Sequence, residues 1–158
     1  MVWLKIAIFT VLAPGTVLFY LPYAIGSAAA AAMPLGPLRF AGLPLILVGF
    51  AIYLRCAWDF GSRGRGTPAP IDPPRELVAQ GLYRYVRNPM YLGGLTILIG
   101  HVLWFRAPAL LLYAGAVFLA FYLFVVVYEE PALTRKFGES YLRYRNAVPR
   151  WIPHRPSA

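Results

Sequence analysis

The sequence predicts an all-α integral membrane protein with four transmembrane helices, the last two forming a C-terminal helical hairpin, and an amphipathic interfacial helix near the C-terminus. Three observations support this fold class. Hydrophobic residues make up 59% of the 158 residues and charged residues only 13%, which is too apolar for a soluble domain of this size. Long windows without a charged side chain recur along the chain, and basic residues gather between them.

Four windows lack charged side chains: residues 6–38, 40–54, 88–105 and 107–128. A transmembrane helix needs roughly 17 to 25 residues. The second window is short, but Arg39 and Arg55 at its ends can snorkel and extend it to residue 58. Small residues and prolines end the first helix near Ile25, and only "RAP" (106–108) separates the third helix from the fourth. We therefore expect one membrane domain over residues 1–158, with two helices in 1–58 and the loop, hairpin and tail in 59–158.

The basic residues predict the orientation. With four crossings, the N-terminus, the loop and the C-terminal tail share one side, which holds thirteen of the fifteen basic residues; Arg39 and Arg106 lie opposite. The positive-inside rule places that side, with both termini and all six acidic residues, in the cytoplasm. The net charge of +9 also favours contact with anionic lipid, whereas nucleic acid is not an expected partner.

A cleaved signal peptide is an alternative for the first window, because Lys5 precedes it and "SAAA" resembles a cleavage site. Such a segment has an apolar core of about 7 to 15 residues, whereas the apolar run before Ser27 is longer and contains Pro14 and Pro22.

Cys56 is the only cysteine, which excludes an internal disulfide and a cysteine-clustered metal site. No metal is expected.

The loop after residue 58 begins rich in glycine and proline, as flexible connectors do. Its second half predicts a short helix. Asp72 can cap that helix with Pro73 at its first position, Glu76 suits the positive end, and Gly81 suits a left-handed stop after Gln80.

The third helix carries two signals. Gly93 and Gly100, seven residues apart, permit close approach of a neighbouring helix. His101 is the only ionisable group in the span, and we expect a neutral histidine that is hydrogen-bonded across the helix interface rather than a catalytic one.

Glu129 and Glu130 stand side by side where the fourth helix ends. Adjacent carboxylates at a membrane boundary repel each other and lose hydration unless cations or hydrogen-bond donors face them. The alternative is a solvated pair bridged to a loop arginine.

After Pro131, four apolar and aromatic residues share one helical face, which predicts an amphipathic helix that lies on the bilayer or covers a site beside it; they are Leu133, Phe137, Tyr141 and Tyr144.

Two stretches, "LVAQGLYRYVRNPMYLGG" (77–94) and "EEPALTRKFGESYLRYRNAVPRWIP" (129–153), resemble the isoprenylcysteine carboxyl methyltransferase and phospholipid methyltransferase superfamily of integral membrane enzymes. The resemblance covers the chain from Gly66 onward and rests on the two motifs at this spacing. Residues 1–58 contribute little to it beyond hydrophobicity.

The resemblance implies a cytoplasm-facing pocket for S-adenosylmethionine, and methyl transfer to a lipophilic acceptor such as a lipid, a prenyl compound or a small apolar thiol. The family's cofactor contacts, carried over residue by residue, fall on eleven positions: Arg75, Glu76, Leu77, Val78, Tyr83, Asn88, Pro89, Met90, Tyr91, Glu129 and Glu130.

The two stretches have side chains that complement the parts of this cofactor. Tyr83 and Tyr91 can stack on the adenine or face the sulfonium cation. Arg87 can hold the carboxylate. Glu129 or Glu130 can accept hydrogen bonds from the ribose hydroxyls or the ammonium group.

Two positions depart from the family pattern. Many members have histidine where this chain has Asn88, and asparagine cannot titrate, so we expect no general base there and assign no catalytic residue. Members that act on prenylated cysteine place an arginine shortly before the glutamates, where this chain reads "FVVVY" (124–128), which argues against that substrate. Arg84 and Tyr85 are assigned to membrane anchoring.

Two other functions are compatible with such a chain. Membrane steroid and sterol reductases have a similar C-terminal half and bind NADPH, but they have asparagine and glutamate where this chain has Met90 and Gly94. A non-enzymatic membrane protein that binds a lipid or a partner is the other alternative, and the glutamate pair counts against it.

Overall fold

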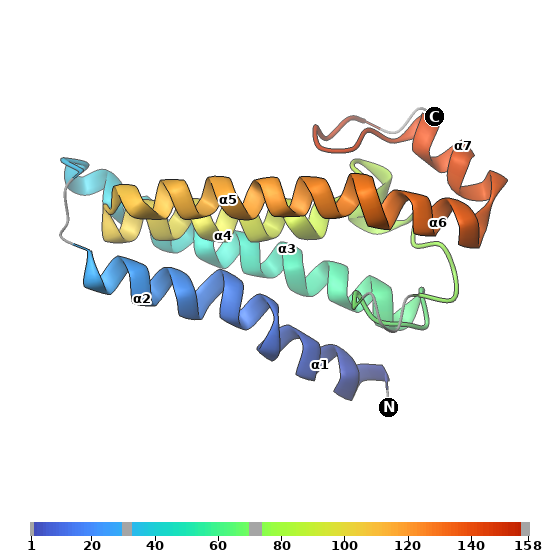
Figure 1. The fold of residues 1–158 in the computed structure, drawn as a ribbon, viewed down its shortest axis with the longest axis horizontal. Helices are drawn as coiled ribbons and strands as arrows, with labels where there is room; N and C mark the ends of the chain where they lie inside the picture. Colours follow the sequence, from blue (N-terminus) through green and yellow to red (C-terminus); the bar gives the residue numbers. More distant parts are fainter. Residues whose placement is uncertain (1, 30–32, 70–73, 156–158) are drawn as a thin grey trace.

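The computed structural model describes residues 2–29, 33–69 and 74–155, and all regular structure in this part of the chain is helical (Figure 1). The predicted all-α class is therefore confirmed. The elements in chain order are α1 (Val2–Leu12), the π-helical η1 (Thr16–Tyr20), α2 (Leu21–Ala28), the 3₁₀ turn η2 (Gly36–Ala41), α3 (Gly42–Ser62), the 3₁₀ turn η3 (Gly81–Arg84), α4 (Pro89–Phe105), α5 (Pro108–Phe124), the π-helical η4 (Val125–Glu129), α6 (Glu130–Phe137) and α7 (Glu139–Ala147).

Three continuous helical stretches are long and apolar enough to cross a membrane: Val2–Ala28, Gly36–Ser62 and Pro108–Phe137. The remaining predicted span, the third along the chain, is the shorter apolar helix α4, with 17 residues. It turns into α5 through Arg106, which adopts a left-handed conformation with φ of 56°, so the predicted tight hairpin is confirmed.

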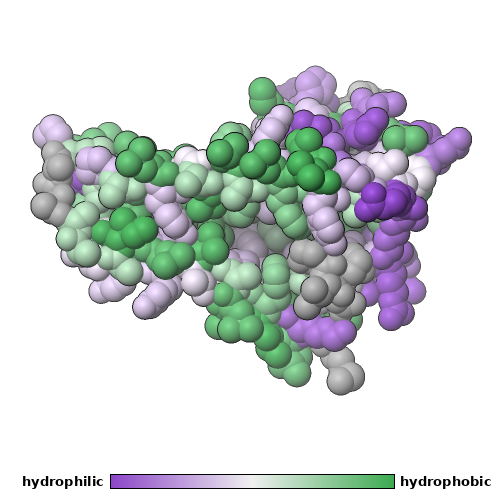
Figure 2. Space-filling view, viewed as in Figure 1, coloured by the Kyte–Doolittle hydropathy of each residue, from purple (hydrophilic) through white to green (hydrophobic). Residues whose placement is uncertain are grey.

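The N-terminus, the loop between α3 and α4 and the C-terminal tail gather at one end of the bundle (Figure 1). We call this the polar end. Hydrophilic residues concentrate there, while apolar residues cover much of the rest of the face in Figure 2. The predicted grouping of the loop and the two terminal regions is therefore present in the fold itself.

Helices α3 and α4 approach each other at glycines, as Gly93 and Gly100 predicted. A Cβ atom built on Gly93 would lie 2.9 Å from the Gly49 carbonyl oxygen, and one on Gly100 would lie 2.7 Å from that of Gly42. These contacts are with backbone, which cannot move aside like a side chain. Small residues on both helices therefore fix the distance and the register of the pair.

The fourth predicted helix does not end at residue 128, as the sequence suggested, but continues through η4 into α6. Proline in a helix removes one hydrogen bond and its ring clashes with the carbonyl four residues earlier. Here the N–H of Glu130 bonds to the Val125 carbonyl, five residues back, and the widened turn admits Pro131. The same arrangement recurs at η1, where Leu21 bonds to Thr16 just before Pro22.

The predicted amphipathic helix after Pro131 is also corrected. It consists of two helices, α6 and α7, which meet at Gly138 with φ of 53°. Glycine adopts this left-handed backbone without steric cost, so the chain reverses there and α7 folds back beside the polar end (Figure 1).

The short helix predicted after Asp72 is wrong for residues 74–80, which are irregular; Asp72 and Pro73 lie outside the described residues. The N–H groups of Arg75 and Glu76 bond to the Gly64 carbonyl instead of forming a helical turn. Val78 is buried against Cys56 and Tyr83, so tertiary packing overrides the local signals. The left-handed conformation of Gly81 is confirmed, with φ of 61°.

His101 also differs from its prediction. Its Nδ1 lies 3.0 Å from the carbonyl oxygen of Ile97 in the same helix, so this hydrogen bond does not cross the helix interface. The ring stacks on Phe105 and meets Phe19 edge-on.

Candidate active site

A cavity of about 140 Å³ opens at the polar end. Its walls come from segments far apart in the chain: the end of α3, the loop, the start of α4, and the continuous stretch from α5 to α7. The lining residues are Phe60, Thr67, Pro68, Ala69, Pro74, Leu77, Val78, Tyr83, Arg87, Asn88, Tyr91, Phe124, Val125, Tyr128, Glu129, Glu130, Ala132, Leu133, Lys136, Phe137, Tyr141 and Tyr144.

Most of the sequence-predicted site residues meet at this cavity. Eight of the twelve line it: Leu77, Val78, Tyr83, Arg87, Asn88, Tyr91, Glu129 and Glu130. The face of Leu133, Phe137, Tyr141 and Tyr144, predicted to lie on the bilayer or to cover a site, lines it as well.

The other four predicted residues lie outside the lining. Arg75 and Glu76 are exposed on the loop, where Glu76 lies 3.6 Å from Arg65. Pro89 is buried as the first residue of α4. Met90 lines a neighbouring apolar cavity instead.

Glu129 forms one side of the cavity together with Tyr91. The Tyr91 hydroxyl donates a hydrogen bond of 2.9 Å to Glu129 Oε2, and its ring packs against Phe121 at 4.8 Å. A neutral phenol thus fixes the Glu129 carboxyl group through one hydrogen bond. The carboxylate keeps its capacity to accept further hydrogen bonds, since its two oxygens offer about four lone-pair sites.

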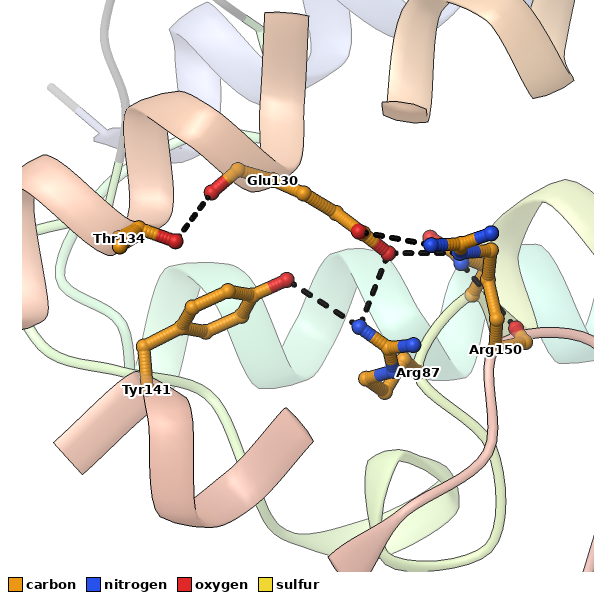
Figure 3. A network of polar contacts seen from close by, with 6 residues as sticks. Arg87, Glu130, Thr134, Tyr141 and Arg150 are labelled. Carbon is orange, nitrogen blue, oxygen red and sulfur yellow. Dashed lines mark hydrogen bonds and ion pairs between the residues drawn. The ribbon is translucent and has the colours of Figure 1, made fainter. Parts of the chain in front are cut away.

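Glu130 has a different environment (Figure 3). Its Oε1 accepts from Arg87 Nη1 at 2.9 Å and from Arg150 Nε at 2.7 Å, and its Oε2 accepts from Arg150 Nη2 at 2.9 Å. The pairing with Arg150 is bidentate, the strongest geometry for a guanidinium and a carboxylate. The bridge to a loop arginine that we considered for the glutamates is therefore present at Glu130.

Arg87 is held between Glu130 and Tyr141, whose hydroxyl oxygen lies 3.4 Å from Nη1. Its side chain is only 10% exposed, and its Nε–H has no hydrogen-bond partner within the described residues. A buried donor without a partner costs about 1 to 3 kcal/mol. The arrangement therefore suits a ligand that carries an acceptor group.

Two tyrosines complete the wall nearest the loop. Tyr144 donates a hydrogen bond of 2.8 Å to the Tyr83 carbonyl, and the Tyr83 ring meets Phe60 edge-on at 5.8 Å. Burial raises the pKa of both phenols above the ordinary value for tyrosine, because it disfavours the phenolate. Both side chains remain neutral near pH 7.

The sequence reasoning assigned no role to Arg150 or Trp151. Neither lines the cavity, but Arg150 binds Glu130 and Trp151 packs near Tyr91, with ring centroids 6.4 Å apart. Both belong to the "PRWIP" run (149–153) of the second motif, so the resemblance to the family could have marked them as candidates. They lie in irregular chain, so no periodicity pointed to them.

Comparison with known proteins bears on most of the chain that forms the cavity. The family model described as phospholipid methyltransferase matches residues 38–140, which include the first twelve residues of the second motif and all of the first. The chain belongs to this family. The resemblance drawn from the two motifs is thereby confirmed.

Individual relatives agree with the family. A protein-S-isoprenylcysteine O-methyltransferase of Schizosaccharomyces pombe is 35% identical over 77 residues, which cover 49% of this chain and 33% of the relative. Protein-S-isoprenylcysteine O-methyltransferase B of Arabidopsis thaliana is 31% identical over 78 residues, which cover 49% of this chain and 40% of the relative. The matched stretch thus spans less than half the length of either relative. No solved structure matches the chain with significance.

Proposed function

We propose that this protein is a membrane-embedded methyltransferase that uses S-adenosylmethionine and acts on a lipophilic acceptor. The observation that carries the proposal is the cavity in which Glu129, Tyr91 and Arg87 come together from the two family motifs. Family membership supports the reaction class.

The residues at this cavity fit the cofactor. Arg87 has a buried Nε–H without a partner in the described chain, which suits a carboxylate. Glu129 has carboxyl oxygens that suit an ammonium group or a ribose diol. Tyr83 and Tyr91 offer aromatic rings for stacking or for a cation. Arg75, Glu76, Pro89 and Met90 stay predictions from the resemblance, since they do not line the cavity.

Bound S-adenosylmethionine would supply an electrophilic methyl group on a sulfonium. The chain contributes alignment and exclusion of water, through the loop and the helices α6 and α7 that surround the cavity. Asn88 cannot act as a general base, and it donates its amide N–H to the Arg150 carbonyl at 3.1 Å. A carboxylate or thiolate acceptor needs no base, whereas an ammonium acceptor must first lose a proton.

A lipophilic acceptor is supported by a second cavity. This space of about 160 Å³ shares Pro68 and Tyr91 with the first cavity and is otherwise lined mostly by apolar side chains of α1, η1, α4 and α5. A third cavity, of about 980 Å³, shares the lining residues Pro14, Leu18 and Tyr53 with the second cavity. The three form a series from the polar end into the apolar part of the bundle, which suits an acceptor with a hydrocarbon chain.

The deciding experiment is to incubate the detergent-purified protein with methyl-labelled S-adenosylmethionine and a membrane lipid extract, and to identify the labelled product. We expect label in a lipophilic product. A thermal scan separates the alternatives: S-adenosylhomocysteine should stabilise the protein by about 2.7 kcal/mol at a hundredfold excess over its dissociation constant, and NADPH should not. Stabilisation by NADPH alone would favour the reductase function.

We further propose that α4 also crosses the membrane, which gives four spans with both termini and the cavity in the cytoplasm. The gathering of the loop and the two terminal regions at one end supports this arrangement (Figure 1). A reporter fused after residue 158 and a tag inserted near Gly64 should both be cytoplasmic. Detection of either one outside would contradict the four-helix arrangement.

A further inference from the structure

Residues 148–155, which we call the C-terminal strap, run beside residues 85–88, directly before α4, without lining the cavity. Three hydrogen bonds tie the strap to that segment. The Arg87 N–H donates to the Pro149 carbonyl at 2.9 Å, the Asn88 side chain donates to the Arg150 carbonyl, and the His154 N–H donates to the Tyr85 carbonyl at 2.9 Å. The strap is therefore a second layer behind the cavity wall.

Arg150 is the charged residue through which this layer reaches the site. Its guanidinium engages both oxygens of Glu130, at 2.7 and 2.9 Å, and Figure 3 shows it on the opposite side of the carboxylate from Tyr141. The Arg150 side chain is 31% exposed, whereas those of Glu130 and Arg87 are only 11% and 10% exposed. Arg150 thus bridges solvent and a nearly buried ion pair.

The consequence concerns Arg87. Glu130 accepts a hydrogen bond from one nitrogen of Arg87, Nη1, because Arg150 already donates to both carboxylate oxygens. Without Arg150, Glu130 would draw the Arg87 fork into a bidentate pair of its own. With Arg150 present, the two arginines and one glutamate keep a net positive charge, and the Arg87 Nε–H stays without a hydrogen-bond partner among the described residues.

We infer that Arg150 is a positioning residue, which occupies Glu130 so that Arg87 remains available to bind the carboxylate of an amino-acid-type ligand. The inference rests on the proposed function, since it assumes that the cavity binds the cofactor. Trp151 assists by packing near Tyr91, Phe118 and Tyr122.

The test is a double-substitution cycle read by the binding of labelled S-adenosylhomocysteine to detergent-purified protein. Arg150→Gln should lower the affinity about tenfold, of the order expected for one hydrogen bond to a charged group. Glu130→Gln removes the charge that competes for Arg87. In that background, Arg150→Gln should change the affinity by no more than about twofold.

A second probe separates positioning from general damage. The loss in Arg150→Gln should disappear with the decarboxylated analogue of S-adenosylhomocysteine, which offers Arg87 no carboxylate. Arg150→Lys keeps the charge but not the bidentate fork, so its affinity for S-adenosylhomocysteine should fall less, by about threefold. This variant also tests the inference if Arg150→Gln does not fold. Arg143→Gln removes the exposed pair with Glu139 and should bind like the parent.

Several outcomes would overturn the inference. An equal loss in both backgrounds would mean that Arg150 contacts the ligand directly. An equal loss for both probes, or a lowered melting temperature with unchanged affinity, would mean that Arg150 only stabilises the strap. If the parent protein binds S-adenosylhomocysteine and the Arg150 variants match it, only this inference fails; if the parent does not bind it, the proposed function fails as well.

Discussion

The interface of α3 with α4 and the polar end are held together in opposite ways. Between the helices, Gly42 and Gly49 meet Gly100 and Gly93 so closely that no side chain fits. At the polar end, the charged Glu130 is held by two arginines. The packing of the first region depends on glycines, which have no side chain, and that of the second depends on long charged side chains. We therefore expect substitutions in the first to affect folding, and those in the second to affect ligand binding first.

The largest effect should come from Gly49→Leu. A Cβ atom at this position would lie 2.5 Å from the Gly93 carbonyl oxygen and 2.8 Å from the Ile97 side chain. Overpacking typically costs about 1 to 3 kcal/mol, and contact with backbone leaves less room for relief. We expect little folded protein after purification in detergent, measured by size-exclusion profile and melting temperature.

Gly115→Leu on α5 is the matched control for that substitution. Nothing lies within 4 Å of a Cβ atom built there, so the same change should be tolerated. If Gly49→Leu folds as well as Gly115→Leu, the close approach of α3 and α4 is not a stabilising feature.

The next effect should come from Glu129→Gln at the polar end. The variant keeps the shape of the side chain but removes its charge, and hydrogen bonds to charged groups contribute about 1.5 to 3 kcal/mol. We expect an unchanged melting temperature of the free protein and a loss of about tenfold or more in S-adenosylhomocysteine affinity. Glu130→Gln should lose less than about threefold, because its carboxylate faces the arginines. If Glu129→Gln binds S-adenosylhomocysteine as tightly as the parent does, Glu129 does not contact the ligand.

The same contrast explains what could be predicted from the sequence. Gly93 and Gly100 carry a steric rule that holds wherever two helices meet, so their close approach was predictable. Leu133 and Phe137 of α6 line the cavity as their helical spacing indicated, whereas Tyr141 and Tyr144 of α7 line it after the chain reverses at Gly138. The irregular path of residues 74–80 depends on the distant Gly64 carbonyl, and the pairing of Arg150 with Glu130 depends on a tail without periodicity. Neither contact leaves a local pattern, so the first was predicted wrongly and the second was missed.

A smaller effect is expected from Tyr91→Phe. The change removes the hydroxyl that donates to Glu129 Oε2 at 2.9 Å and keeps the ring that packs on Phe121. One hydrogen bond contributes about 0.5 to 1.5 kcal/mol, so the affinity for S-adenosylhomocysteine should fall roughly two- to tenfold. Titration of the variant by the same binding assay checks this value. A loss much larger than that of Glu129→Gln would indicate that the Tyr91 hydroxyl contacts the ligand itself.

The smallest effect should come from Tyr85→Phe, in the same segment as Arg87 and Tyr91. Tyr85 is 43% exposed and does not line the cavity. Its contribution to the polar end is its backbone carbonyl, which accepts the hydrogen bond from the His154 N–H and is unaffected by loss of the hydroxyl. At a membrane surface the ring serves as an aromatic anchor, a role that phenylalanine largely keeps. We expect both the melting temperature and the S-adenosylhomocysteine affinity to match those of the parent. A lowered affinity would mean that the ligand extends beyond the cavity toward the strap, and that the wall formed by Tyr91 and Glu129 is not the limit of the site.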